Sequence, residues 1–221
     1  MDCKVISIVD IKGGSKQDTF SLNLAKTFLD LGRVLLLDLD PQAKISSYLK
    51  IYQQFSIFNI LNRSEDFHNV VQKTEYKNLF FLPSNIDVSK IEKDEVLISR
   101  ISEVMKYLRT KFDYIIIETP PYLNRSILNV LNSSENIIIP FEIKHHTQYF
   151  VENLFLEIEK DKKVKIVPIM YEDENSNIYS DILKQYPEHL IKLGSTSLKI
   201  DKDDLDLDSK FKQIQKVILN D

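Results

Sequence analysis

Short apolar runs recur along the chain, and most are followed by a segment with helical spacing. Six runs are aliphatic or β-branched at most positions: Lys4–Val9, Val34–Leu37, Leu79–Leu82, Tyr114–Ile117, Ile137–Ile139 and Val164–Ile169. A strand that is apolar on both of its faces is typical of a parallel sheet whose two sides are covered by helices. The runs therefore predict the strands of a buried, mostly parallel sheet.

The segments between these runs place apolar residues three or four positions apart, which is the spacing of one helix face. The first segment has a stripe of this kind, formed by Phe20, Leu24, Phe28 and Leu31. The helices predicted in this way are Thr19–Leu31, Asp94–Leu108, Leu123–Leu131, Gln148–Glu159 and Ile178–Gln185. Strands that alternate with helices predict a doubly wound α/β fold, which has helices on both faces of the sheet and binds ligands beyond the carboxyl ends of the strands.

The length and composition fit one domain. The chain has 221 residues, of which 43% are hydrophobic, and this is enough for a sizeable core. Only four glycines and seven prolines occur, so no long linker is expected and residues 1–221 are predicted to form a single α/β domain. The part from about 171 to 221 is less periodic and contains the acidic run DKDDLDLD, so we expect it to be a divergent part of the same domain.

Charge and cysteine content narrow the possible functions. The net charge is −4, so any contact with nucleic acid must come from a local basic patch. The single cysteine, Cys3, excludes a disulfide framework within one chain. No signal-peptide pattern is present, and no apolar run approaches the roughly 18 residues that a membrane span needs. We therefore expect a cytoplasmic protein.

Three predicted strands end in segments that carry chemistry. Residues Asp10–Thr19 follow the first strand and contain a glycine pair. Asp38 and Asp40 follow the second, and Glu118 follows the strand FDYIII. Metal-assisted phosphoryl chemistry needs a loop that surrounds phosphates, a carboxylate that holds Mg²⁺ and another that orients the attacking water. These three segments together supply such a set.

The order and wording of these segments resemble the ParA/MinD family of deviant-Walker P-loop ATPases, and among them the ParA-type partition proteins. The family's loop reads K-G-G-x-G-K-[ST]-[ST] and precedes a helix with NLA; here KGGSKQDT precedes NLA. LLLDLDPQ and DYIIIETPP are similar to the second and third motifs, and the resemblance covers about residues 4–170. It implies ATP and Mg²⁺ as cofactors, and as nucleotide-binding residues Lys12, Gly13, Gly14, Ser15, Lys16, Gln17, Asp18 and Thr19.

The same resemblance implies roles for single residues. Lys12 would be the signature lysine, a catalytic residue that reaches the nucleotide of the partner subunit in such dimers. Asp40 would position the hydrolytic water, and Asp38 would contact the Mg²⁺ shell. Backbone N–H groups of Gly13 and Gly14 would face the phosphates, next to the partial positive charge of a helix N-terminus.

Three neighbouring positions depart from the family pattern. In a gapless alignment, Lys16 replaces the third glycine, Gln17 the phosphate lysine and Asp18 the Mg²⁺-binding hydroxyl. A gapped alignment would make Lys16 the phosphate lysine, but it shortens the loop and leaves Gln17 at the hydroxyl position. Losing a desolvated charge partner costs about 2–5 kcal/mol, and a carboxylate about 5 Å from a phosphate adds about 3 kcal/mol of repulsion. We therefore expect weak or absent ATP binding and hydrolysis.

Asp18 has two possible roles in the altered loop. It can ligate Mg²⁺ directly, together with Asp38 and Glu118. Alternatively, it lies at the start of a helix, where a carboxylate caps free N–H groups and acts as a built-in anion in place of a phosphate, with Lys12 or Lys16 as counter-charge. We favour the second role. Glu118 stands where the family has aspartate, a change that either leaves the site intact or slightly shifts its metal geometry.

Three functions follow from the resemblance. The first is a ParA-like partition protein with a degenerate nucleotide site that acts as a dimer and adaptor. The second is a working ParA-type Mg-ATPase with an unusual loop, and the third is a MinD-like positioning protein that uses SKFKQIQKVIL, residues 209–219, as a membrane-surface helix. For this segment we favour a terminal helix packed on the domain, so membrane association is not expected. A homodimer, a ParB-like partner, non-specific DNA and association with the nucleoid are implied by the resemblance alone.

Overall fold

A seven-stranded sheet forms the centre of the molecule. The computed structural model describes residues 2–9, 17–52, 54–142, 147–158, 162–169, 186–191 and 209–220. The strand order is β3-β4-β2-β5-β1-β6-β7, and only β3 runs antiparallel to its neighbour. The strands are β1 Lys4–Ile8, β2 Val34–Asp38, β3 Gln72–Lys73, β4 Leu79–Leu82, β5 Tyr114–Glu118, β6 Asn136–Glu142 and β7 Lys163–Ile169.

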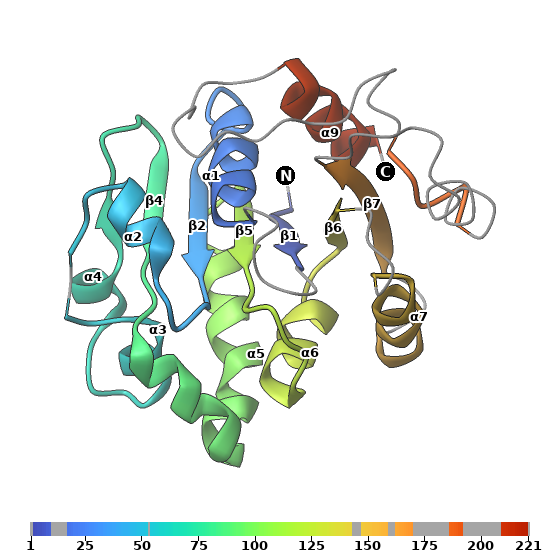
Figure 1. The fold of residues 1–221 in the computed structure, drawn as a ribbon. Coiled ribbons are helices and arrows are strands. Elements are labelled where there is room, and N and C mark those ends of the chain that lie inside the picture. The colour runs from blue at the N-terminus through green and yellow to red at the C-terminus, as the bar shows by residue number, and fades with distance from the viewer. Residues whose placement is uncertain are drawn as a thin grey trace.

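Helices connect the strands and cover both faces of the sheet (Figure 1). Those described are α1 Gln17–Thr27, α2 Lys44–Tyr48, α3 Ile57–Leu61, α4 Phe67–Val70, the 3₁₀ helix η1 Ile86–Lys93, α5 Glu95–Arg109, α6 Arg125–Asn132, α7 Thr147–Glu157 and α9 Ser209–Asn220. The predicted doubly wound, mostly parallel α/β fold is therefore confirmed. The predicted helix Ile178–Gln185 and the run DKDDLDLD lie outside the described residues.

Neighbouring residues of the central strands point to opposite faces, and each face has its own core. Leu35 and Ile115 belong to the core under α5 and α6, whereas Leu36 and Ile116 belong to the core under α1 and α9. All four side chains are fully buried. Burial on both faces explains why these strands are aliphatic at most positions rather than alternating with polar residues.

The first and last described helices lie side by side, although nearly the whole chain separates them (Figure 1). Phe211 of α9 packs on Phe20 of α1 with ring centroids 5.1 Å apart, and Ile214 and Ile218 are also buried in this core. Gln215 donates a hydrogen bond to the Thr27 carbonyl at the end of α1. The apolar face of α9 is therefore used in packing, as the favoured interpretation of this segment predicts.

The sequence pattern overestimates the length of α1. The helix ends at Thr27, and Leu31, which was expected to complete the apolar stripe, is 47% exposed. The residues from Phe28 to Gly32 instead form turns that lead into β2. Within the described residues, no helix is both long and apolar enough to cross a membrane.

Candidate functional site

The strands that precede the three chemistry-bearing segments end at one edge of the sheet. Strand β5 lies between β1 and β2, so Glu118 at its end is level with Asp38 on one side and Ile8 on the other. Parallel strands place their carboxyl ends at the same edge, where ligands bind in open α/β sheets. The register therefore brings the ends of β1, β2 and β5 together at this edge.

Asp38 and Glu118 form a buried pair of carboxyl groups. Asp38 is fully buried and Glu118 is 3% exposed. Burial, above all other effects, raises the pKa of Asp38 to about 7, although hydrogen bonds from Glu118 and from the Asp40 backbone oppose the rise. Burial and then the charge of Asp38 raise the pKa of Glu118 well above its usual value. Near neutral pH the pair therefore holds a proton, because ionising both of two neighbouring buried carboxyl groups has a high free-energy cost.

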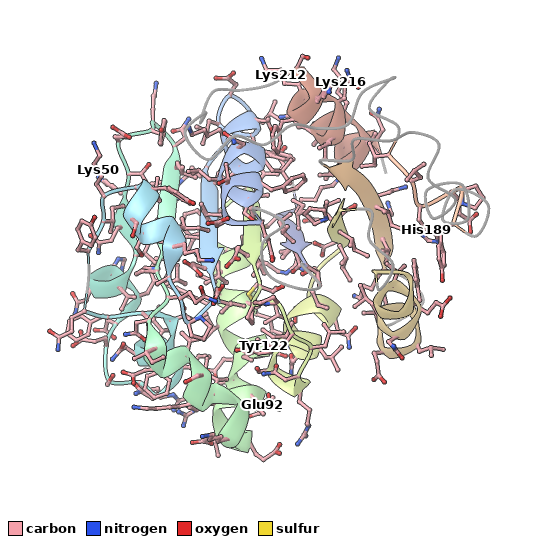
Figure 2. All side chains as sticks on the ribbon, viewed as in Figure 1. Lys50, Glu92, Tyr122, His189, Lys212 and Lys216 are labelled. Carbon is pink, nitrogen blue, oxygen red and sulfur yellow. The ribbon has the colours of Figure 1, made fainter. Side chains whose placement is uncertain are left out.

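Asp40 lies at the rim of this edge, less deeply buried than Asp38. Its own N–H donates to Asp38 Oδ1 at 2.9 Å, and its Oδ1 accepts from the Gln42 N–H at 2.9 Å. The second contact fixes the Asp40 side chain in a turn of the Asx type. Tyr122, which is 42% exposed, lies near enough that burial and the charges of Asp40 and Glu92 raise its pKa. Figure 2 shows Tyr122 and Glu92 near one another.

Gln17, which the gapless alignment predicts to replace the phosphate lysine, points into the domain. Its side chain is buried, and its amide nitrogen donates to the carbonyls of Ile8, at 2.5 Å, and Thr119, at 2.9 Å. A primary amide nitrogen carries two hydrogens, so both donors of Gln17 are used. The Thr119 hydroxyl also donates to the Ile8 carbonyl at 2.9 Å. Gln17 thus joins the start of α1 to the ends of β1 and β5.

Asp18, which the gapless alignment predicts to replace the metal-binding hydroxyl, accepts a hydrogen bond from a residue that the sequence patterns did not single out. The Tyr48 hydroxyl of α2 donates to Asp18 Oδ2 at 2.9 Å. The helix begins at Gln17 rather than near Thr19, so Asp18 is in its first turn rather than in the expected cap position. A carboxylate there still interacts favourably with the helix dipole. Thr19 is fully buried, and its hydroxyl has no hydrogen-bond partner among the described residues.

The remaining predicted nucleotide-binding residues, Lys12, Gly13, Gly14, Ser15 and Lys16, lie outside the described part of the chain. Their predicted roles at the phosphates therefore stay predictions. The described residues contribute the start of α1 and the ends of β1, β2 and β5. Of the predicted site residues that are described, Asp38 and Glu118 pair directly, and Asp18 is close enough for its charge to raise the pKa of both.

The donor set at this edge fits Mg²⁺ in part. Asp38 Oδ2 and Glu118 Oε2 are buried without a hydrogen-bond partner within the described ranges, and carboxylate oxygens are the ligands that Mg²⁺ prefers. However, no group of three or more His, Cys, Asp or Glu side chains in the described residues is arranged to hold a metal ion. The pair therefore offers two ligands, and a third has to come from elsewhere.

Comparison with known proteins identifies the family. Residues 3–169 match the model of the family described as AAA domain (AAA_31). The sporulation initiation inhibitor protein Soj of Bacillus subtilis is 32% identical over 151 residues, which are 65% of this chain and 60% of Soj. The chromosome-partitioning ATPase Soj of Treponema pallidum is 28% identical over 73% of this chain and 65% of its own. The chain thus matches less than two thirds of the length of either relative.

A solved structure of a partition protein has the same fold as this chain. A plasmid partition protein from Borrelia burgdorferi has a TM-score of 0.81 and 25% identity, and 99% of each chain is covered. The family match covers most of the chain, and the strand order and the ends of β1, β2 and β5 agree with it. The chain belongs to the AAA domain family and is a ParA/MinD-type P-loop ATPase homologue related to the partition proteins.

Proposed function

We propose that this chain is a ParA-like partition protein that acts as a dimeric adaptor, with weak or absent ATP binding and hydrolysis. The observation that carries the proposal is at the start of α1. The amide of Gln17 is bonded to two backbone carbonyls, and the carboxylate of Asp18 accepts from Tyr48. Neither residue offers a positive charge or a metal-binding hydroxyl to a nucleotide. Kinship with Soj and with a plasmid partition protein supports the role in DNA segregation.

Calorimetric titration of ATP with Mg²⁺ tests the loss of nucleotide binding. The wild type is compared with a triple repair of the loop, Lys16→Gly, Gln17→Lys and Asp18→Thr. We expect the repaired protein to bind ATP at least about a hundred times more tightly. It regains a lysine that can pair with a phosphate, and it loses a carboxylate that repels one. Equal affinity of the two proteins would contradict the proposal.

A working Mg-ATPase of the same type is the second candidate. The oxygens of Asp38 and Glu118 that lack a partner among the described residues favour it, since they provide two ligands for Mg²⁺. A third ligand would still be needed. Bound Mg²⁺ would neutralise the charge of the phosphates, and Asp40 would orient the attacking water. Phosphate release, measured with and without DNA, separates the candidates: turnover that an Asp40→Asn variant abolishes supports the ATPase.

DNA and a ParB-like protein are the proposed partners, and α9 is the proposed DNA contact. Lys212 and Lys216 lie on its outer side, away from the domain (Figure 2), and both are exposed. The helix carries no acidic residue, in contrast to the net negative chain. Replacing both lysines by glutamate should weaken DNA binding at low salt and reduce its salt dependence. Replacing Lys106 and Lys111, which are exposed on and after α5, is the matched control.

We also propose a cytoplasmic homodimer whose residues 171–221 belong to the same domain as the rest. The packing of α9 on α1 supports a single domain, because it joins the last described helix to the first. Sedimentation of the protein with and without ATP tests the dimer. A dimer that forms without nucleotide supports an adaptor, and a strictly ATP-dependent dimer supports the ATPase.

A further inference from the structure

Two cations lie on aromatic rings near the amino ends of β2 and β5. The Arg33 guanidinium, directly before β2, lies over the rings of Phe80 and Phe112, and its Cζ is 5.1 and 5.2 Å from their centroids. The Lys111 ammonium group, shortly before β5, lies 5.2 Å from the centroid of the Tyr107 ring on α5. Both cations precede their strands, so they are at the opposite edge of the sheet from the predicted nucleotide site.

The rings form a continuous chain between the two cations. Phe80 and Phe112 have centroids 5.4 Å apart, and Phe67 of α4 is 6.2 Å from Phe112 and 5.4 Å from Tyr107. Helix α4 and strand β4 lie on the same side of the molecule (Figure 1). Phe112 is buried, whereas Tyr107 is 41% exposed. We call the two cations and the four rings beneath them the cation–aromatic surface: Arg33, Phe67, Phe80, Tyr107, Lys111 and Phe112.

Neither cation of this surface has an acidic partner. All five arginines of the chain are described, and hydrogen bonds to a carboxylate or carbonyl oxygen are made by the side chains of Arg63, Arg100, Arg109 and Arg125. Within the described ranges, the Arg33 guanidinium and the Lys111 ammonium group make no hydrogen bond and no ion pair, although both are exposed. The Asp113 carboxylate accepts from the Arg33 backbone N–H at 2.7 Å and pairs with neither cation.

This arrangement prepares both cations for a carboxylate. A guanidinium carries five N–H donors in a fixed plane and can bind a carboxylate through two parallel hydrogen bonds. The rings of Phe80 and Phe112 restrict the Arg33 side chain without using these donors. Less conformational entropy is therefore lost when an anion binds to it. Lys111 offers a second positive charge at the other end of the chain of rings.

The same contacts favour an acidic protein segment over a nucleic acid. Binding of single-stranded nucleic acid uses ring faces on which bases stack. The ring faces of Phe80 and Tyr107 that meet the cations are already covered. A phosphate backbone also needs a long row of cations, whereas two carboxylates need only the two that are present. The net charge of −4 opposes the binding of a polyanion further.

We propose that the cation–aromatic surface binds an acidic segment of a partner protein, with one carboxylate on Arg33 and a second on Lys111. The surface and the nucleotide site are at opposite edges of the sheet, so a partner bound here does not compete with a ligand there. The proposal goes beyond the proposed function and does not depend on whether ATP binds. It gives an adaptor a second place at which to hold a partner.

Fluorescence anisotropy with a labelled peptide that alternates glutamate with serine tests the proposal at low salt. The wild type should bind the peptide, and Arg33→Gln should lower the affinity at least about tenfold, because a charge-assisted pair is lost. Lys111→Gln should lower it by a smaller factor. Arg33→Lys keeps the charge but not the two parallel bonds, so it should recover only part of the loss. Arg125→Gln is the matched control, because it makes the same charge change at an exposed arginine paired with Glu95, and it should bind as the wild type does.

Four results would overturn the proposal. They are no binding of the peptide by the wild type, equal affinity of the wild type and Arg33→Gln, an equal loss in Arg125→Gln, and tighter binding of oligothymidylate than of the peptide with the same dependence on Arg33. Thermal unfolding checks that each variant is folded. If Arg33→Gln does not fold, Lys111→Gln decides the outcome, since the Lys111 side chain is exposed and its loss leaves the buried rings in place.

Discussion

The ends of β2 and β5 and the start of α1 are two halves of one site, and they differ in how their polar groups are satisfied. At the strand ends, Asp38 and Glu118 are buried and each keeps an oxygen without a partner in the described residues. At the start of α1, Gln17 and Asp18 have hydrogen-bond partners from the protein itself. We call the first half open, because two of its carboxyl oxygens have no partner in the described residues, and the second half closed, because its polar side chains are hydrogen-bonded within the chain.

On the proposed function, this difference separates the half of the site that departs from the family pattern from the half that keeps its carboxylates. The strand ends are fixed by the register of β2 with β5 and by buried backbone, so their carboxylates stay in place. The start of α1 accommodates its present residues, because the amide of Gln17 donates to two backbone carbonyls and the carboxylate of Asp18 accepts from a hydroxyl. Buried polar groups are tolerated when they are hydrogen-bonded, and the replacements at α1 meet that condition.

The open half gives the largest expected effect, which is a dependence of stability on pH. In the folded protein the pKa of Asp38 rises from 3.8 to about 7, so the unfolded state releases its proton first as the pH rises. The stabilisation of the folded state by protonated Asp38 is fully present below pH 4 and is lost between about pH 4 and 7. The shift corresponds to about 4 kcal/mol of unfolding free energy. In Glu118→Gln the loss of unfolding free energy with rising pH should be smaller than in the wild type. The variant should therefore be more stable than the wild type at pH 8.

Urea unfolding at pH 4 to 8 measures this effect. Glu103→Gln is the control, since Glu103 is an exposed carboxylate paired with Arg63 on the surface, and it should follow the wild type within about 1 kcal/mol. A pH dependence of Glu118→Gln equal to that of the wild type would show that the pair does not retain a proton.

The closed half gives an intermediate effect. Gln17→Met keeps the shape of the side chain but removes both donors to the Ile8 and Thr119 carbonyls. We expect the free energy of unfolding to fall by about 1–3 kcal/mol, because the Thr119 carbonyl loses a buried donor while Ile8 retains those of Thr119. Gln42→Met, at an exposed glutamine, should change stability by less than about 0.5 kcal/mol. If the two variants are equally stable, the amide of Gln17 does not join α1 to the sheet.

The smallest effect concerns the turn between the halves. Ala43→Gly relieves the left-handed backbone at φ 50°, but it also increases the entropy of the unfolded chain. The balance should stabilise the protein by at most about 1 kcal/mol in thermal unfolding. Ala25→Gly, inside α1, should instead destabilise it by about 1 kcal/mol. Destabilisation by both changes would mean that the turn is not strained.

The sequence pattern predicts the sheet well because each strand can be recognised from the apolar residues of its own short segment. A run such as YIII in β5 is apolar on both faces wherever it is placed, and alternation with helices then implies parallel order. The strand-end residues Asp38 and Glu118 were located for the same reason. Short elements were not predicted: α2 and α3 have five residues each, and too few positions to show a periodicity.

The contacts of the site residues could not be predicted from the sequence. Asp18 was expected to cap a helix, but the helix begins earlier and the carboxylate accepts from Tyr48 of α2. No spacing in the sequence relates two residues that are brought together only by the packing of α2 on α1. For Glu118 the sequence left two alternatives, an intact site or a slight shift of its metal geometry. Its pairing with Asp38 could not be predicted, because it depends on a register that only the folded sheet defines.

The packing of α9 on α1 has a consequence for the order in which the protein folds. The Gln215 side chain of α9 donates to the Thr27 carbonyl of α1, a contact between residues 188 positions apart. A ribosome makes α1 long before α9, so one apolar side of α1 lacks its cover throughout most of synthesis. Contacts of such long range also slow folding, because the chain must close a large loop to make them. Helix α1 is therefore expected to be among the last parts to reach its final packing, and one side of it would stay accessible to a chaperone until then.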